Sequence, residues 1–123
     1  MADDIITLAG RRILVCDPAG PLVRGEAEAV DLLGSTWGQD IDWLVLPTAR
    51  LAPDFLTLRT GVAGAVTQKM VTYGMRLAIV GDISAEVAAS DALRDYVRES
   101  NAGRHVWFVP DMAALETRFR ASS

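Results

Sequence analysis

The stretch that decides the fold runs from Asp54 to Gly81 and reads DFLTLRTGVAGAVTQKMVTYGMRLAIVG. Apolar side chains three or four positions apart predict one buried face of an amphipathic helix that begins near Thr60. The residues of this face are Val62, Val66, Met70 and Tyr73. Gly74 then supplies the left-handed residue that commonly ends a helix. The continuous apolar run Leu77–Val80 predicts a strand buried on both faces, as in a parallel sheet.

The rest of the chain continues this alternation of helices and strands in both directions. Further apolar runs predict strands at residues 5–8, 12–16, 43–46 and 106–109. A short turn joins the first two runs into a predicted hairpin, and helices are predicted from Pro21, after Ser90 and after Asp111. The first of these helices is expected to bury Val23, Ala27, Val30, Leu33 and Trp37. The order ββαβαβαβα predicts one three-layer α/β domain over residues 1–123 with a mostly parallel sheet.

Length, net charge and the lack of long apolar runs exclude several classes of protein. A chain of 123 residues buries about two-thirds of its unfolded surface, so it needs neither disulfides nor a metal to fold. The net charge of −4 opposes nonspecific nucleic-acid binding, which depends on Lys and Arg. No apolar run approaches the ~20 residues that span a membrane, and the acidic start is unlike a signal peptide. We therefore expect a cytoplasmic protein, in which Cys16, the only cysteine, is a buried inert thiol.

Two resemblances follow from these residues. The segment Leu58-Arg59-Thr60-Gly61, its helix and the apolar strand resemble the signature of the STAS domains of bacterial anti-sigma-factor antagonists, Asp-Ser-Ser-Gly or Asp-Ser-Thr-Gly. A wider similarity, from about Phe55 to Val109, is to the bacterial domain of unknown function numbered 4180. Its matching residues are 60–64, 68–69, 77–82, 99–101 and 108–109. The first resemblance implies a STAS-like fold and a regulatory role with a transcription or stress-response protein as partner, whereas the second carries no activity.

The signature departs from the STAS pattern at the position that matters for regulation. In the anti-sigma antagonists a partner kinase phosphorylates the first Ser, and alignment on Gly61 puts Arg59 there. Thr60 matches only the second hydroxyl position. The usual phosphoacceptor serine is therefore missing, and Arg59 implies a permanent docking contact or a cradle for an anion at the helix start. Thr60 is expected to cap the helix, with regulated phosphorylation as the alternative.

The predicted partner-binding surface is the loop at 48–58 together with the helix start at 59–64. Arg59 is its expected charged anchor, and Asp54 and Phe55 are expected to add charge and an apolar contact. Alternatively, Phe55 and the leucines of the loop pack it onto the domain. Gly61 and Gly64 favour tight packing of the helix on the sheet, although they also permit close approach of a partner.

A second candidate site follows from carboxylates at strand ends. Asp17, Asp82 with Ser84, and Asp111 each follow a predicted strand, and the carboxyl ends of parallel strands share one sheet edge. Three carboxylates there are able to hold Mg²⁺, yet Asp also caps helices and turns, which is the interpretation we favour.

The sequence favours a non-enzymatic regulatory or adaptor module that binds a protein partner. We expect no catalytic residues, no cofactor, no metal, and no nucleic-acid or membrane partner. The alternative is a small-molecule or anion-binding domain that uses the acidic strand-end edge. Self-association as a homodimer is a third interpretation that the sequence leaves open.

Overall fold

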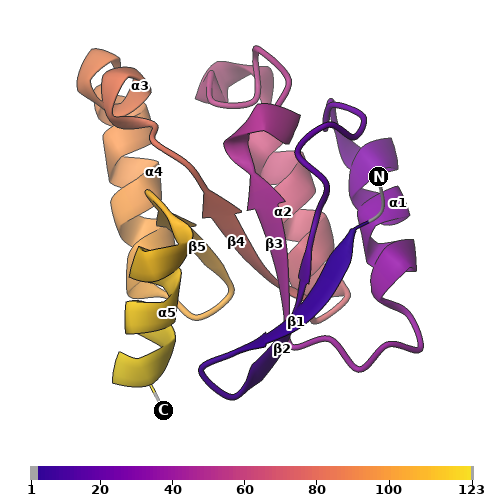
Figure 1. Ribbon diagram of the computed structural model, residues 1–123. Helices are drawn as coiled ribbons and strands as arrows, with labels where there is room; N and C mark the ends of the chain where they lie inside the picture. Colours follow the sequence, from indigo (N-terminus) through magenta and orange to yellow (C-terminus); the bar gives the residue numbers. More distant parts are fainter. Residues whose placement is uncertain (1–2, 123) are drawn as a thin grey trace.

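The computed structural model describes residues 3–122, and over these residues the chain folds into one five-stranded mixed sheet with five α-helices (Figure 1). The strands are β1 (Asp4–Leu8), β2 (Arg11–Val15), β3 (Trp43–Pro47), β4 (Arg76–Val80) and β5 (Val106–Val109). The helices are α1 (Glu26–Thr36), α2 (Val62–Thr72), α3 (Ser84–Ala89), α4 (Asp91–Ala102) and α5 (Met112–Ala121). Two 3₁₀ turns, η1 (Thr48–Arg50) and η2 (Leu58–Thr60), separate β3 from α2. The predicted α/β class is confirmed.

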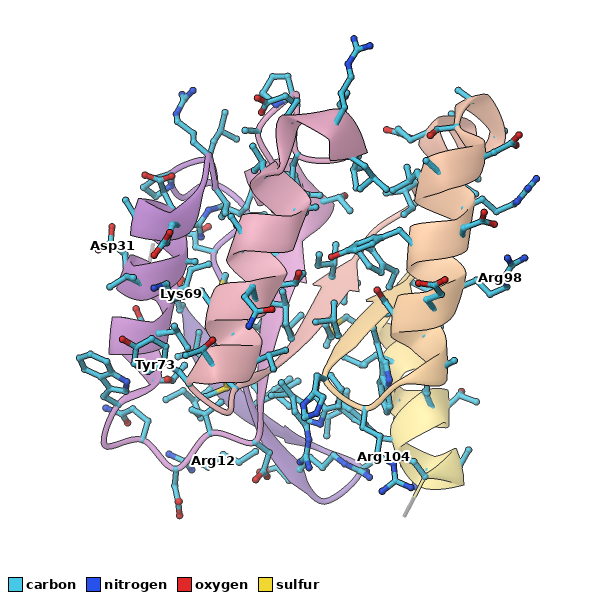
Figure 2. The ribbon with its side chains drawn as sticks, turned by 180° about the vertical axis from the view of Figure 1, so that it is seen from behind. Arg12, Asp31, Lys69, Tyr73, Arg98 and Arg104 are labelled. Carbon is cyan, nitrogen blue, oxygen red and sulfur yellow. The ribbon has the colours of Figure 1, made fainter. Side chains whose placement is uncertain are left out.

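The strands lie in the sheet in the order in which they occur in the chain, β1-β2-β3-β4-β5. β1 pairs antiparallel with β2, and the other three pairs are parallel. When each new parallel strand is added on the same side of the previous one, right-handed crossovers place all the connecting helices on one face of the sheet. Accordingly, α1, α2 and α4 lie together on one face, whereas α5 lies on the other (Figures 1 and 2).

The two faces of the sheet have separate apolar cores. The larger core joins side chains of β2–β5 to α1, α2 and the loop after η1, and includes Leu44, Phe55, Met70 and Ile79. The smaller core lies under α5 and contains aromatic rings: the centroids of Trp43 and Trp107 are 4.4 Å apart, and that of Phe119 is 5.5 Å from Trp43. A sheet covered on both faces explains why the strands are continuous apolar runs.

The first helix differs from its prediction. It begins at Glu26 rather than Pro21, and its buried residues are Ala29, Leu32, Leu33 and Thr36. Val23 is not helical; it forms a parallel bridge to Leu51, in which its N–H donates to the carbonyl of Arg50 at 2.6 Å. Since Val23 does not belong to the helix, the face predicted from it is wrong, and Trp37 is 64% exposed.

The second helix ends as predicted, but of its predicted buried face only Val66 and Met70 are buried, and Val62 is half-buried. Gly74 has a φ of +69° and follows the helix end. Tyr73, predicted to be buried, is exposed, and the ammonium of Lys69 lies 5.8 Å from the centroid of its ring. Lys69 also forms an ion pair with Glu26 of α1 at 2.6 Å. Lys69 and Tyr73 are side by side on the outer surface of α2 (Figure 2).

Candidate functional site

A hollow of about 740 Å³ opens where β3 and β4 end, between the loop after β3 and helix α3. We call it the carboxyl-end groove; both walls lie beyond the arrowheads of these strands (Figure 1). Its apolar lining consists of Ala49, Leu51, Ala52, Pro53, Leu56, Leu58, Ile83, Ala89 and Ala92. Its polar lining consists of Thr48, Thr57, Arg59, Asp82, Glu86 and Ser90. The groove is therefore a mainly apolar trough with one cation and two carboxylates in its wall.

The backbone after β4 passes very close to the loop after β3, so the two sides of the groove are in contact at its base. A Cβ atom placed on Gly81 lies only 2.1 Å from Oγ1 of Thr48, so the chain after β4 can pass this close to η1 only as glycine. The N–H of Gly81 donates to the carbonyl of Val109 at 2.9 Å. The groove thus sits on backbone that is fixed to the sheet.

A buried arginine fixes the start of the same loop. Arg50 is 7% exposed, and its Nε and Nη1 donate to the carbonyls of Pro21 at 2.5 Å and Asp17 at 3.0 Å. A Cβ atom on Gly20 lies 2.6 Å from Nη1, so the loop after β2 wraps directly over the guanidinium. Arg50 therefore has a structural role, joining two loops at the carboxyl ends of β2 and β3.

The predicted partner-binding residues divide into exposed and buried members. Arg59 lines the groove, whereas Asp54 is exposed but does not line it. Phe55 is 0% exposed and belongs to the larger core, so its prediction as a surface contact is corrected. Burial of this aromatic ring anchors the loop from 48 to 58, together with the partly buried Leu51, Leu56 and Leu58 that pack against the same core.

Thr60 closes the turn before α2. Its Oγ1 is 2.9 Å from the carbonyl of Thr57, 3.1 Å from that of Asp54, and accepts from the N–H of Val62 at 3.3 Å. The hydroxyl thus contacts an N–H of the first helical turn, as predicted for a cap, although the N-cap position itself is Gly61.

The two glycines of this segment do not serve tight packing. Gly61 has a φ of +78°, the left-handed conformation that favours glycine. Gly64 is exposed, and a Cβ atom there has no heavy atom within 4 Å. The favoured interpretation, that both glycines let the helix sit tightly on the sheet, is therefore wrong.

The acidic strand-end residues do not form one site. Oδ1 of Asp17 accepts from the N–H of Ala19 at 2.9 Å, and Asp17 lines a different hollow of about 250 Å³ beside Arg50. Oδ1 of Asp111 accepts from the N–H of Ala114 at 2.8 Å and caps α5. Among residues 3–122 no three acidic, His or Cys side chains are placed to hold a metal ion.

Of the three acidic strand-end residues, only Asp82 lines the carboxyl-end groove. Its Oδ1 accepts from the backbone N–H of Ser84 at 2.9 Å. Hydrogen bonds from Ser84, the side chain first and the backbone second, lower the pKa of the Asp82 carboxyl. The shared acidic edge is thus corrected to three separate turn or cap residues, because each carboxylate accepts from the backbone of its own loop.

Helix α3 supplies the wall that the sequence interpretation missed. Glu86 and Ala89 of this helix line the groove with Ile83, which precedes it, whereas the sequence predicted no element over residues 84–89. The available signal was the run from Ser84 to Ala89, rich in alanine, the strongest helix former. A helix of six residues is too short to show an apolar period.

The fold and groove define a small α/β domain built on a single mixed sheet. The chain belongs to a family described as Domain of unknown function (DUF4180), whose model matches residues 8–119. No curated protein matches the chain, and no solved structure does either. None of the helices between residues 3 and 122 is long and apolar enough to cross a membrane.

Proposed function

We propose that this domain is a non-enzymatic regulatory or adaptor module with a STAS-like fold, which binds a segment of a protein partner in the carboxyl-end groove. The observation that carries the proposal is the groove itself, an apolar trough of about 740 Å³ formed by the loop at 48–58 and α3. Its volume lies within the roughly 300–1,000 Å³ typical of binding sites, and its position at the strand ends is where α/β sheets bind ligands.

The lining supports a partner segment of particular chemistry. Leu51, Leu56 and Ile83 present apolar surface, so the segment carries aliphatic or aromatic side chains. Arg59 is exposed and favours an acidic residue on the partner, whereas Glu86 favours a basic one. Opposite charges in one trough fix the direction in which the segment lies, because reversing it brings like charges together.

Arg59 also supports regulation that differs from the STAS phosphoswitch. It stands where those domains have the phosphorylated Ser, and its positive charge is permanent. Thr60 is exposed, yet its Oγ1 already contacts three backbone groups of the turn. We therefore propose binding that does not depend on phosphorylation at either position.

The test combines capture of a partner with a matched pair of variants. Ala88 and Ala89 are both exposed in α3, but only Ala89 lines the groove. Wild type is used to capture proteins from a lysate of the source organism, and the captured protein is purified. Its Kd is then measured against wild type, Ala89→Trp and Ala88→Trp by isothermal titration calorimetry.

The expected result is at least about tenfold weaker binding by Ala89→Trp, because the indole fills the trough, and unchanged binding by Ala88→Trp. Arg59→Glu is expected to weaken binding by about tenfold, with Arg24→Glu, an exposed arginine outside the groove, as control. If all variants bind the captured protein equally, or if wild type retains nothing specific, the groove is not a partner site.

A further inference from the structure

A second hollow, of about 340 Å³, lies at the opposite end of the sheet, where β2, β3 and β4 begin. Its lining consists of Arg11, Trp43, Arg76, Arg104, Trp107 and Ser122. We call it the arginine hollow. Three of the twelve basic residues of an acidic chain gather here, and none of the lining residues within 3–122 carries a carboxylate. Such clustering of one charge, against a net charge of −4, favours an anionic ligand.

The three arginines come from separate parts of the fold. Arg11 begins β2, and Arg76 begins β4 directly across from Trp43 of β3. Arg104 precedes β5 and projects at the lower edge of the molecule in Figure 2. The sheet register therefore brings together guanidinium groups that are far apart in the sequence.

Most of the hydrogen-bonding capacity of these arginines is unused. Arg11 donates from Nη1 to the carbonyl of Phe119 at 2.8 Å and from Nη2 to Oγ of Ser122 at 3.1 Å. The side chains of Arg76 and Arg104 are exposed and make no hydrogen bond or ion pair with any residue in the described part of the chain. Each guanidinium carries five N–H donors, so a ligand oxyanion meets available donors on at least two sides.

The floor of the hollow is aromatic. Trp43 and Trp107 line it and are nearly fully buried, with ring centroids 4.4 Å apart. Nε1 of Trp107 donates to the carbonyl of Gly103 at 2.9 Å, and the guanidinium of Arg118 lies 4.0 Å from the Trp107 centroid. The floor therefore presents the edges of two indole rings, which suit the apolar part of a ligand.

We propose that the arginine hollow binds a small oxyanionic molecule of the phosphate-ester class, with its apolar portion against Trp43 and Trp107. Guanidinium groups bind phosphate and carboxylate through paired N–H donors, and three positive charges match a doubly charged phosphate ester better than a single carboxylate. The volume suits a small molecule. This site is separate from the carboxyl-end groove and independent of the partner proposed for that groove.

Phenyl phosphate is the probe, because it combines a doubly charged phosphate with one aromatic ring. Phenol and benzoate separate the contributions of the ring and of a single carboxylate, and inorganic phosphate separates that of the anion alone. Binding is followed by calorimetry and by tryptophan fluorescence in a Trp37→Phe background, since Trp37 is exposed and adds unrelated signal. Ionic strength is held constant because exposed charges are screened by salt.

Phenyl phosphate is expected to bind saturably, more tightly than benzoate or inorganic phosphate, and phenol is expected not to bind. Arg76→Gln and Arg104→Gln are each expected to weaken binding by about tenfold, since each removes a charged hydrogen-bond donor. Arg24→Gln is the matched control: it removes the same charge from an exposed position that lines neither hollow, and it is expected to change the affinity by less than about twofold.

Three results overturn the proposal. One is the lack of any saturable signal with phenyl phosphate up to about 10 mM, a concentration far above a functional Kd. Another is equal weakening in the Arg24→Gln control, which indicates an effect of net charge rather than of a site. The third is binding of single-stranded DNA without binding of phenyl phosphate. Melting temperatures near wild type in the Gln variants show that a loss of binding is not a loss of fold.

Discussion

Replacing Arg50 by methionine tests whether this buried arginine holds the loops at the carboxyl end together. Methionine keeps the apolar stem but removes the donors to the carbonyls of Pro21 and Asp17. A lysine at the same position restores the charge but has a single nitrogen in place of the arginine fork. Arg50→Lys is therefore expected to recover at most one of the two hydrogen bonds.

The magnitude follows from these two bonds. A hydrogen bond from a charged donor contributes about 1.5–3 kcal/mol, so losing two at the lower end costs about 3 kcal/mol of unfolding free energy. For a domain of 123 residues, 1 kcal/mol shifts the Tm by roughly 3–4 °C, which gives a decrease of about 10 °C. Arg24→Met, an exposed arginine in the loop between β2 and α1, is expected to cost less than about 0.5 kcal/mol.

The assay is urea unfolding followed by circular dichroism, with thermal melts in parallel. Because Ala49 and Leu51 flank Arg50 and line the carboxyl-end groove, Arg50→Met is also expected to weaken partner binding. A loss below about 1 kcal/mol in Arg50→Met refutes the reasoning. It shows that water replaces the guanidinium at both carbonyls, and that the loops are held by the Val23–Leu51 bridge instead.

Three further predictions concern the small core, the thiol and the pH dependence. Phe119→Ala is expected to lower the free energy of unfolding in urea by about 3–5 kcal/mol, because it leaves a cavity in the aromatic core under α5. A decrease below about 1 kcal/mol contradicts that packing. Burial raises the pKa of Cys16 to about 12, with a smaller increase from Asp3 and an opposing decrease from Arg50. Iodoacetamide is therefore expected to label the thiol only after unfolding. Label found by mass spectrometry on native protein at neutral pH contradicts this. The pKa of Asp82 lies below its ordinary value of 3.8, so its contribution to stability is full above that value and is lost as the pH falls through the folded-state pKa. Asp82→Asn is expected to lower the urea midpoint at neutral pH and not in strong acid; an equal decrease at both contradicts a role for the carboxylate charge.

The fold was predictable where local patterns decide it. The continuous apolar run at 77–80 forms the last four residues of β4, and Gly74 ends α2 with the expected positive φ. The prediction failed where contacts distant in sequence decide the structure. Val23 has an apolar spacing that suits a helix, but pairing with Leu51 removes it from α1 and shifts the start of that helix.

The candidate site was predictable in part. The loop and Arg59 form one wall of the carboxyl-end groove, as a long loop after a strand suggests. Phe55 was ambiguous because an aromatic residue in a loop serves equally as an anchor or as a contact, and only its burial decides. The arginine hollow left no signal in the sequence, since Arg11, Arg76 and Arg104 are far apart in the chain and meet only in the folded domain.

Each strand of the sheet hydrogen-bonds to the strand that comes next in the chain. Closing the segment between neighbouring strands therefore costs less conformational entropy than in a sheet whose strands interleave. The sheet can grow strand by strand while the ribosome is still making the carboxyl-terminal part. The exception is the face under α5, which is the last helix to emerge. Until it does, Trp43 and Trp107 remain open to solvent, so a nascent chain exposes its aromatic face to chaperones and to aggregation.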